Sequence, residues 1–325
     1  MNIQAELAIV GGGPAGLAAG IEAARRGVQV TLVDLGDQPG GALALQTHRY
    51  DVLAGLAIGS LLWRTAEAAG VTMLPRTLAW GLFEDRTLGL AIGHGTEREQ
   101  SAILQAERVL IATGAVDRPP VFPGATLPGV MTATAATIAM HRWRVRPGHS
   151  AVIVGDDAVS EHIAQYARDA GMSVARTPAA VGLHALAGPD GTLARVERRG
   201  ADGAPQEVFA VDVMVLATGM QPANELARMV DCAMVWSEPL GGHVPHSDAN
   251  MQTSVPGVSV VGDAAGVGDA GSAILQGRVA AAAIADALEK KKRPFGPFPV
   301  TLTAGAFRPI DLAVWRSVRG PEGIR

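Results

Sequence analysis

Short apolar runs and helical patterns alternate along the first part of the chain. The run Leu7–Val10 is followed by a glycine-rich turn, after which apolar residues recur at helical spacing over Ala15–Arg26. Gly27 ends that helix, and a second apolar run, Val28–Val33, stops at Asp34. Strand, turn, helix and strand in this order predict a parallel βαβ unit.

The turn between the first strand and the helix carries the pattern G-x-G-x-x-G. Gly11 allows the tight turn, Gly13 lets the backbone approach a pyrophosphate, and Gly16 lets the helix pack close to the strand. Pro14 and Ala15 open the helix, where backbone N–H groups and the positive end of the helix dipole favour an anion. The turn therefore predicts a dinucleotide site to which these five residues contribute.

Two features after the second strand fit the same site. Asp34 lies about 20 residues beyond the glycine turn, where a carboxylate is expected to accept a hydrogen bond from a ribose hydroxyl. Gly40 and Gly41 lie in a loop at the carboxyl end of this strand. Their backbone either lies against a flat cofactor ring or forms an ordinary turn, and the sequence leaves both alternatives open.

The following segments complete the first domain. The pattern predicts a helix over 51–69, a strand over 71–74, an antiparallel patch from 77–84, 88–94 and 97–105, and a buried strand over 108–115. That strand ends in Ala112, Thr113 and Gly114, small residues that permit the close approach of backbone or of a ligand. The Pro-rich stretch Arg118–Gly129 is stiff and extended, and it predicts a crossing into another domain.

The second half of the chain repeats this order. It holds a strand over 151–154, a turn at Gly155, a helix to about 170, a strand over 173–176, a meander over 193–211, and a strand over 213–219 that again ends in Ala-Thr-Gly. The similarity predicts an α/β fold of two Rossmann-like dinucleotide-binding domains, the second inserted in the first. The predicted boundaries are 1–117 and 246–290 for the first domain, 118–245 for the inserted domain, and 291–325 for a C-terminal tail.

The glycine turn of the inserted domain is degenerate. Asp157 and Ser160 stand where the second and third glycines belong, and the aspartate brings bulk and negative charge toward a pyrophosphate. Both effects oppose the binding of NAD(P), which makes this cofactor doubtful. Arg176, after the next strand, either pairs with a 2′-phosphate or is a solvated surface residue.

The return to the first domain brings a third part of the site. An apolar strand ends at Gly262 and Asp263, and the carboxylate either accepts a hydrogen bond from a sugar or ribitol hydroxyl or caps a helix. A helix over 272–287 follows. Its first residues, Ser272 and Ala273, are expected to face the pyrimidine edge of a flavin, where negative charge grows on reduction.

Composition narrows the classes of function. The 325 residues are 48% hydrophobic and 18% charged, which supplies enough apolar material for large cores, and a net charge of −4 does not favour nucleic acid. The one cysteine, Cys232, permits neither an intrachain disulfide nor a cysteine-rich metal or iron–sulfur site, and a buried thiol is predicted. His243 and His246 lie close in sequence without supporting carboxylates, so no metal is predicted.

The two ends of the chain bear on location and partners. The N-terminus runs directly into the first strand and the apolar runs are short, so no signal peptide and no membrane segment are predicted, and the expected location is cytoplasmic. The tail combines a basic run at 290–293 with Phe295, Phe298, Phe307 and Trp315. It either packs on the body of the protein or docks a partner.

Together these motifs resemble those of the two-domain flavoproteins of the glutathione and thioredoxin reductase superfamily. The matching residues are Gly11, Gly13, Gly16, Asp34, Ala112–Gly114, Ala217–Gly219 and Gly262–Asp263, and they cover the chain to about residue 288. The resemblance implies FAD in the first domain and, usually, NAD(P)H in the second.

A narrower resemblance is to the α-type subunits of multi-subunit amine and amino-acid dehydrogenases. This group includes the B subunit of hydrogen cyanide synthase, the A subunit of opine oxidase and the dye-linked proline or hydroxyproline dehydrogenases. The matching segments are Ala112–Pro119, Phe122–Gly124, Leu127–Thr132, Gly262–Gly266 and Gln276–Arg278. This resemblance implies that the partner is a flavoprotein β subunit, which carries its own flavin and the substrate pocket.

The chain departs from these families at two places. Thioredoxin reductases carry Cys-x-x-Cys after the Pro-rich crossing, whereas Met131–Ala136 holds no cysteine, which excludes reduction of a disulfide through that dithiol. Many α-type subunits end in a cysteine-rich 2Fe–2S segment, which this sequence lacks. The resemblance therefore places any iron–sulfur relay on another, small subunit.

Three functions follow from these expectations. The first is a FAD-binding oxidoreductase that serves as the α-type electron-relay subunit of a heteromeric amine or amino-acid dehydrogenase or oxidase. The alternatives are a stand-alone NAD(P)H-dependent flavin reductase and an assembly subunit with a structural adenine nucleotide. No residue pair suited to acid–base chemistry on a substrate stands out, so no catalytic residue is assigned and the chemistry is expected to be that of the flavin.

Overall fold

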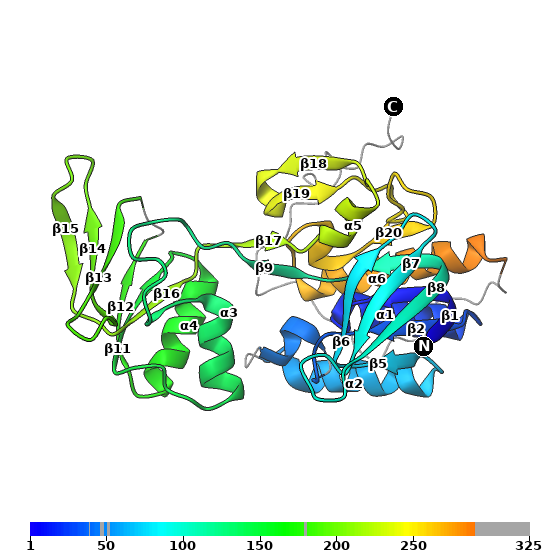
Figure 1. Cartoon of the computed structure of the whole chain (residues 1–325), viewed down its shortest axis with the longest axis horizontal. Coiled ribbons are helices and arrows are strands. Elements are labelled where there is room, and N and C mark those ends of the chain that lie inside the picture. Colours follow the sequence, from blue (N-terminus) through cyan, green and yellow to red (C-terminus); the bar gives the residue numbers. More distant parts are fainter. Residues whose placement is uncertain (39, 46–48, 51–52, 179–180, 290–325) are drawn as a thin grey trace. The chain divides into compact units, whose positions relative to one another are not determined.

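The computed structural model describes residues 1–38, 40–45, 49–50, 53–178 and 181–289. The described residues form two compact units, one made of 1–116 and 221–289, the other of Asp117–Met220. Each unit combines helices with a parallel sheet (Figure 1). The predicted fold class, two Rossmann-like α/β domains with the second inserted in the first, is confirmed.

A seven-stranded sheet forms the centre of the first unit. Its strand order is β5 (Thr72–Leu74), β2 (Val30–Val33), β1 (Asn2–Val10), β8 (Gln100–Ile111), β7 (Thr87–Ile92) and β6 (Thr77–Leu82), and β20 (Val258–Val260) also pairs with β8. The strands β5, β2, β1, β8 and β20 are parallel, whereas β7 and β6 are antiparallel. The first half of β8 pairs with β7 and the second half with β20, so one 12-residue strand replaces the two strands predicted over 97–115.

Side chains of β1 face two hydrophobic cores in alternation. Leu7 and Ile9 pack against α1 (Pro14–Arg25), α2 (Gly55–Ala68) and α6 (Ala270–Ala287), and Ala8 and Val10 pack into a second core on the opposite face. Because both faces of a parallel sheet are covered, its strands are apolar without interruption. That is why Leu7–Val10 shows no polar alternation in the sequence.

The predicted second boundary, near residue 245, is wrong. The chain returns to the first unit at Gln221, and the segment 221–245 packs on that unit through α5 (Glu225–Met229), β18 (Met234–Ser237) and β19 (Gly242–Pro245). Leu226, Val230 and Cys232 of this segment are buried in the same core as Leu82 and Leu88. No Pro-rich stretch marks this crossing, so the sequence carried no linker signal there.

A four-stranded parallel sheet forms the centre of the second unit. Its order is β10 (Val130–Thr132), β16 (Val213–Leu216), β11 (Ser150–Val154) and β12 (Ser173–Thr177). The helices α3 (Ala133–Thr137) and α4 (Ala158–Asp169) pack on one face of it. The predicted meander is a three-stranded antiparallel sheet of β13 (Leu183–Ala187), β14 (Leu193–Arg199) and β15 (Pro205–Phe209), which shares a core with the other face.

Shorter elements complete the described chain. They are β3 (Arg49–Tyr50), β4 (Leu53–Ala54), β9 (Ala115–Asp117), β17 (Met220–Pro222), the π-helix η2 (Ile138–Arg142), and the 3₁₀ turns η1 (Gly41–Leu45), η3 (Glu238–Leu240) and η4 (Gly262–Ala265). The chain crosses between the units through β9 and β17, which pair with each other. The predicted tail lies outside the described residues. In the described part of the chain, none of the helices has the length and apolar character needed to cross a membrane.

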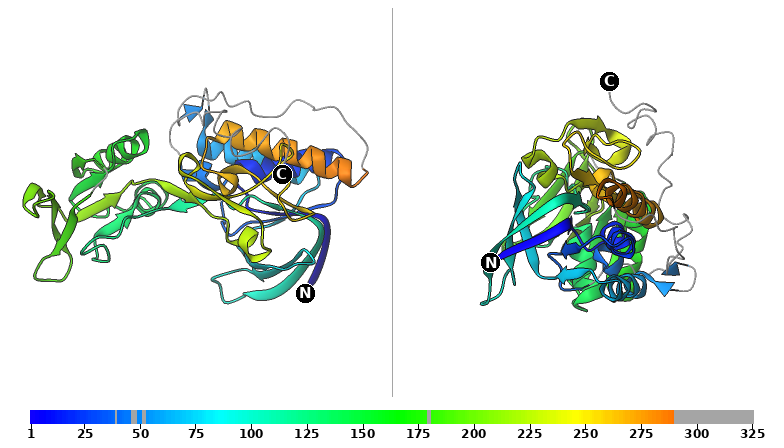
Figure 2. Two further views of the ribbon diagram at one scale, coloured as in Figure 1. Left: turned by 90° about the horizontal axis from the view of Figure 1, so that it is seen from above. Right: turned by 90° about the vertical axis from the view of Figure 1, so that its right-hand side faces the viewer.

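Close packing of α1 on α6 depends on glycine. The two helices lie side by side, dark blue and orange in Figure 2. A Cβ atom at Gly277 of α6 would overlap the backbone carbonyl oxygen of Ala15 at the start of α1. Farther along, buried Glu22 of α1 accepts hydrogen bonds from Arg26 at 2.9 Å and from Arg278 of α6 at 3.4 Å. Backbone contact at one end and an ion-pair cluster at the other therefore fix this helix pair.

We expect Gly277→Ala to destabilise the protein, because the added methyl group meets backbone and forces the helices apart. Overpacking of this kind costs about 1–3 kcal/mol, which lowers the melting temperature by several degrees. Gly20→Ala on α1 is the matched control, since its Cβ finds the nearest atom, Val71 Cγ2, at 3.5 Å, an ordinary contact. Thermal unfolding of both variants decides the matter, and equal melting temperatures would contradict the contact described here.

Candidate functional site

The three glycines of the first turn serve different purposes. Gly11 has a φ of +115°, and a Cβ there would overlap the carbonyl oxygen of Ala112 at the end of β8. A Cβ at Gly16 would overlap the carbonyl oxygen of Gly11. Both residues must therefore be glycine for the fold itself, because the backbones of β1, α1 and β8 meet without room for a side chain.

Gly13 differs because no contact among the described residues requires a glycine there. Its φ is −76°, and a Cβ built on it has no atom within 4 Å. It is the N-cap of α1, no side chain caps the helix there, and Pro14 occupies the first helical position. The first turn of α1 contains no acidic residue. The helix N-terminus thus faces open space with its N–H groups and positive dipole end, which is the geometry of an anion seat.

Asp34 lies at the carboxyl end of β2, directly beside the glycine turn. Its Oδ2 accepts a hydrogen bond from the Gly12 N–H, and its Oδ1 accepts one from the Gly36 N–H at 2.6 Å. Burial raises the pKa of Asp34, while these two backbone hydrogen bonds oppose the rise. Gly12 was not among the predicted site residues, although a Cβ there would overlap the Asp34 carboxylate. Gly12 contacts Asp34 only in the folded protein, and Gly12 is not one of the three glycines of the G-x-G-x-x-G pattern.

The loop after β2 is brought against the glycine turn. The Gly40 N–H donates to the Gly12 carbonyl at 3.1 Å, and a Cβ on Gly41, whose φ is +54°, would lie 2.9 Å from the Cα of Gly13. Gly40, with a φ of +98°, also passes within van der Waals contact of Gly59 on α2. Both glycines are needed because backbone packs on backbone at this place.

Thr113 holds the segment that returns from the second unit. Its hydroxyl donates to the carbonyl of Ala223, and the Ala223 N–H donates to the Gly114 carbonyl at 2.9 Å. The second Ala-Thr-Gly repeats the arrangement within its own unit, where the Thr218 hydroxyl donates to the Arg118 carbonyl at 3.0 Å. The sequence left open whether backbone or a ligand approaches the first of these strand ends, and in the structure the backbone of Ala223 does so. Each Ala-Thr-Gly thus hydrogen-bonds a segment next to a crossing between the units.

Gly262 and Asp263 follow β20 at the same edge of the sheet. The Gly262 N–H donates to Oε1 of Gln276 on α6 at 2.8 Å, and the Gly268 N–H donates to Asp263 Oδ1 at 2.9 Å. Removal from water and the nearby Asp269 carboxylate raise the pKa of Asp263 to about 6. A carboxyl whose pKa is raised this far lies in an environment that disfavours its charge.

The start of α6 is capped by Asp269 rather than by Asp263. Asp269 accepts from the Ser272 N–H at 2.9 Å and from the Ser272 hydroxyl at 2.7 Å. The Ala273 N–H donates to the Asp269 carbonyl, and the Ala273 side chain is buried near Gly262. Helix-capping by Asp263, which the sequence left open, is therefore wrong, because α6 begins at Ala270, seven residues after it.

The structure brings the predicted first-unit residues to one edge of one sheet. Gly11, Asp34, Ala112 and Gly262 follow the carboxyl ends of β1, β2, β8 and β20, which are neighbours in the sheet. Ligands of open α/β sheets bind at this edge. The site has an open helix N-terminus, two carboxyl groups and several glycines against which a flat group can pack.

One histidine of the pair singled out in the sequence packs on an aromatic ring. The His243 ring on β19 lies edge-on to Trp236 on β18, with 5.0 Å between the ring centroids. Across the described residues, no group of three or more histidine, cysteine, aspartate or glutamate side chains is arranged to hold a metal ion. Cys232 is buried, as predicted, and burial raises its pKa.

Comparisons with known proteins agree with this geometry. The family model for pyridine nucleotide-disulphide oxidoreductases matches residues 5–181 and 188–287. The A subunit of opine oxidase from Rhizobium meliloti (strain 1021) is 31% identical over 326 residues, which cover 85% of this chain and 70% of that protein. The alpha subunit of sarcosine oxidase from the same strain is 30% identical over 335 residues, 94% of this chain but only 33% of that protein.

The fold has a counterpart among solved structures. The L-proline dehydrogenase from P. horikoshii superimposes with a TM-score of 0.78 at 22% identity, over 90% of this chain and 57% of that one. Members of the matched family bind FAD, and the open anion seat at Gly13 has the form that a pyrophosphate requires. The chain belongs to the pyridine nucleotide-disulphide oxidoreductase family and is an FAD-dependent oxidoreductase.

Proposed function

We propose that this chain is the α-type, FAD-binding electron-relay subunit of a heteromeric amine or amino-acid dehydrogenase or oxidase. The observation that carries the proposal is the uncapped N-terminus of α1, where Gly13 faces open space and the first turn has no acidic residue. FAD, when bound, supplies the redox chemistry by taking up and releasing electrons. The residues of the chain bind it, orient it and set the electrostatics around it.

The proposed binding residues divide by the part of FAD that they hold. The turn Gly11–Gly16 is proposed to hold the pyrophosphate through backbone N–H groups that include that of Ala15, while Pro14, which has no N–H, occupies the first helical position. Asp34 is proposed to accept from an adenosine ribose hydroxyl. Asp263 Oδ2, which no donor among the described residues reaches, is proposed to accept from a hydroxyl of the ribityl chain.

The ring system is proposed to lie against backbone. Small residues surround that part of the site: Gly40, Gly41, Ala112, Thr113, Gly114, Gly262, Ser272 and Ala273. Since Asp269 already caps α6, Ser272 and Ala273 are proposed to line the site rather than to donate hydrogen bonds to it. No acid–base pair for substrate chemistry is assigned to this chain.

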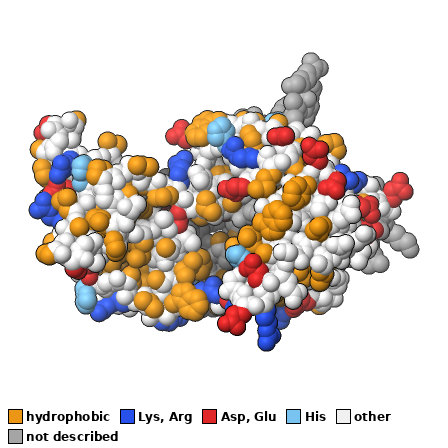
Figure 3. Space-filling model, in the orientation of Figure 1, with side chains coloured by type: hydrophobic (Ala, Val, Ile, Leu, Met, Phe, Trp, Pro, Cys, Tyr) orange, Lys and Arg blue, Asp and Glu red, His pale blue; other side chains and the backbone are white. Residues whose placement is uncertain are grey.

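The proposed partner follows from the relatives. Those reported above include the A subunit of opine oxidase and the alpha subunit of sarcosine oxidase, both of which are named as parts of multi-subunit oxidases. We therefore propose a flavoprotein β subunit that holds the amine substrate, with a small iron–sulfur subunit in the same complex. On the face shown in Figure 3, basic and acidic side chains are interspersed among the described residues, which gives that face no basic stripe for nucleic acid.

We expect Gly13→Asp to abolish FAD retention without loss of the fold. The carboxylate caps α1 in the way that Asp157 caps α4, but it brings bulk and negative charge to the pyrophosphate. The flavin content of the purified variant tests this, with the melting temperature of flavin-free protein as the measure of folding. Gly13→Ala, whose methyl group comes within 4 Å of no non-neighbouring atom in the described part of the chain, is the matched control and should retain more flavin. Full FAD occupancy in the aspartate variant would contradict the proposed seat.

We expect Asp263→Asn to have opposite effects on stability and on FAD affinity. The pKa of Asp263 is higher in the folded, flavin-free protein than in the unfolded chain. The free energy of unfolding therefore falls, by at most about 3 kcal/mol, as the pH rises from about 4 to about 6. The asparagine variant lacks this loss, so above pH 6 its melting temperature should exceed that of the wild type. The NH2 group of asparagine cannot accept the hydrogen bond that a ribityl hydroxyl is proposed to donate to Asp263 Oδ2. FAD should therefore bind about tenfold more weakly.

Thermal unfolding of flavin-free protein between pH 4 and 8, and fluorescence titration with FAD, measure these two effects. Glu84→Gln, which changes an exposed carboxylate of the same unit, is the control and should change neither. An asparagine variant that binds FAD as tightly as the wild type would remove Asp263 from the binding residues.

Co-purification tests whether the chain works within a heteromeric complex. We expect the chain, isolated under its natural promoter with a small tag, to bring down a second flavoprotein in fixed proportion, and the complex to oxidise an amine or amino acid. Isolation of a lone protein that reduces free flavin with NADH or NADPH would favour the flavin reductase. A colourless protein that retains only an adenine nucleotide would favour the structural role in an assembly.

A further inference from the structure

The two dinucleotide-type units of this chain can be compared residue by residue. In the first unit Val10 of β1 pairs with Val33 of β2, and in the second Val154 of β11 pairs with Thr177 of β12, so that the turns and helices that follow β1 and β11 correspond without insertion. The counterparts of Gly11, Gly13, Gly16, Leu17 and Leu32 are Gly155, Asp157, Ser160, Glu161 and Arg176. The second unit thus differs from the first at the second and third glycines of the turn and at a buried strand–helix contact next to it.

Asp157 supplies the second turn with an anion of its own. As N-cap of α4 it accepts a hydrogen bond from the Ser160 N–H on Oδ1 at 2.9 Å, and the Ser160 hydroxyl donates to the Asp157 carbonyl at 2.6 Å. In the first unit the corresponding helix start has no side-chain cap. The carboxylate therefore takes a backbone donor that a pyrophosphate would use.

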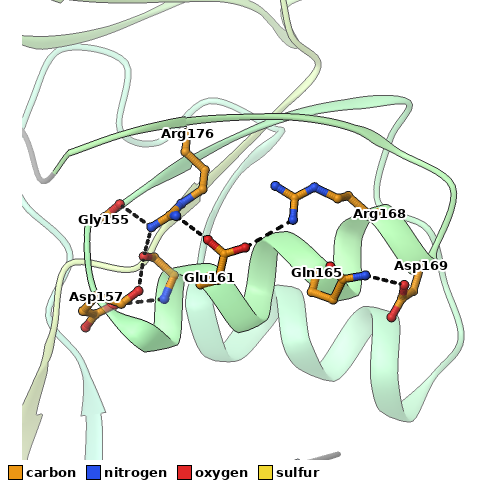
Figure 4. A network of polar contacts seen from close by, with 8 residues as sticks. Gly155, Asp157, Glu161, Gln165, Arg168, Asp169 and Arg176 are labelled. Atoms are coloured by element: carbon orange, nitrogen blue, oxygen red, sulfur yellow. Dashed lines mark hydrogen bonds and ion pairs between the residues drawn. The ribbon is translucent and has the colours of Figure 1, made fainter. Parts of the chain in front are cut away.

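Arg176 fills the space behind this cap. Its Nη2 donates to the Ser160 hydroxyl at 2.8 Å and to the Gly155 carbonyl at 3.4 Å, and its Nη1 forms an ion pair with Glu161 (Figure 4). Glu161 is also held by Arg168 at 3.3 Å. In the first unit the counterparts of Arg176 and Glu161 are Leu32 and Leu17, which are fully buried in one hydrophobic core. An apolar contact between strand and helix is thus replaced by a polar network that reaches up to the turn.

The charges around the second turn also oppose a dinucleotide. Asp156, Asp157 and Glu161 lie at the start of α4, where the phosphates of a dinucleotide would have to approach. The guanidinium of Arg176 faces this cluster and is engaged by Glu161, Ser160 and Gly155, so it is not available for a 2′-phosphate. Carboxylates repel the pyrophosphate that the bare helix dipole would attract.

We infer that the turn Gly155–Ser160 is a nucleotide seat closed by the protein's own side chains, and that the second unit binds neither NADH nor NADPH. The pyridine nucleotide that the family implies does not fit the residues present. This consequence rests on the proposed function: if the chain relays electrons through FAD, the flavin exchanges them with another protein or with a molecule other than a nicotinamide nucleotide.

Equilibrium dialysis of FAD-loaded protein against NADH and NADPH tests the inference. We expect no saturable binding up to millimolar concentration, which corresponds to less than about 4 kcal/mol of binding free energy. We also expect the flavin to stay oxidised when either nucleotide is added without oxygen. Saturable binding with the flavin retained would overturn the inference.

The same dialysis on Gly13→Asp separates this result from the proposed function. That variant has a closed first turn, so any nucleotide it binds must use the second unit. A wild-type protein that fails to retain FAD would contradict the proposed function but not the inference. Binding of NADH or NADPH to Gly13→Asp would contradict the inference but not the proposed function.

Thermal unfolding tests whether the network is part of the fold. We expect Arg176→Leu and Glu161→Leu each to lower the melting temperature by a few degrees, because each removes the ion pair between Arg176 and Glu161, and Arg176→Leu also removes the hydrogen bonds to Ser160 and Gly155. The double variant, which carries the leucines of the first unit, should return to within about 2 °C of the wild type. Arg168→Leu is the control, since it keeps Arg176 and Glu161 paired. An Arg176→Leu variant with the melting temperature of the wild type would show that the Arg176 network does not stabilise the closed turn.

Discussion

The contact of backbone with backbone at the start of α1 is the constraint on which the first unit depends. The carbonyl oxygens of Gly11, Ala15 and Ala112 lie where Cβ atoms of Gly16, Gly277 and Gly11 would have to be. This packing ties the helix start to β1, β8 and α6 at once, and it leaves little freedom in where α1 points. Because the same contact exposes the first N–H groups of α1, the packing that stabilises the fold also forms the anion seat.

The two units share one architecture, but only the first has such a seat. Both units place a glycine turn between a buried parallel strand and a helix, and both end a neighbouring strand in Ala-Thr-Gly. The first helix start is bare, whereas the second is capped by Asp157 and backed by the ion pair of Arg176 and Glu161. The backbone path therefore allows nucleotide binding, and a few side chains decide whether it takes place.

The sequence predicted the part of the fold that local rules govern. Apolar runs, glycine turns and helical spacing placed β1, α1, β2, β11 and α4, because strands covered on both faces and amphipathic helices leave periodic patterns. It missed the return at Gln221, since that crossing is held by hydrogen bonds of Thr113 and Gly114 to Ala223 and not by a Pro-rich linker. It also divided β8 in two, because a strand that changes partners halfway changes its burial pattern as well.

By itself the sequence determined that the chain has two dinucleotide-type domains, that the first keeps its glycines and that the second carries an acid in their place. These features depend on residues close together in the chain, where sterics and helix dipoles act. Only the tertiary structure decided that Gly12 lies against Asp34, that Gln276 holds Gly262, and that Asp269 rather than Asp263 caps α6. It likewise decided that Arg176 closes the second turn from within. Apart from the cap of α6, which is local, these contacts join residues that are distant in sequence, and their geometry depends on how closely glycine lets one backbone approach another.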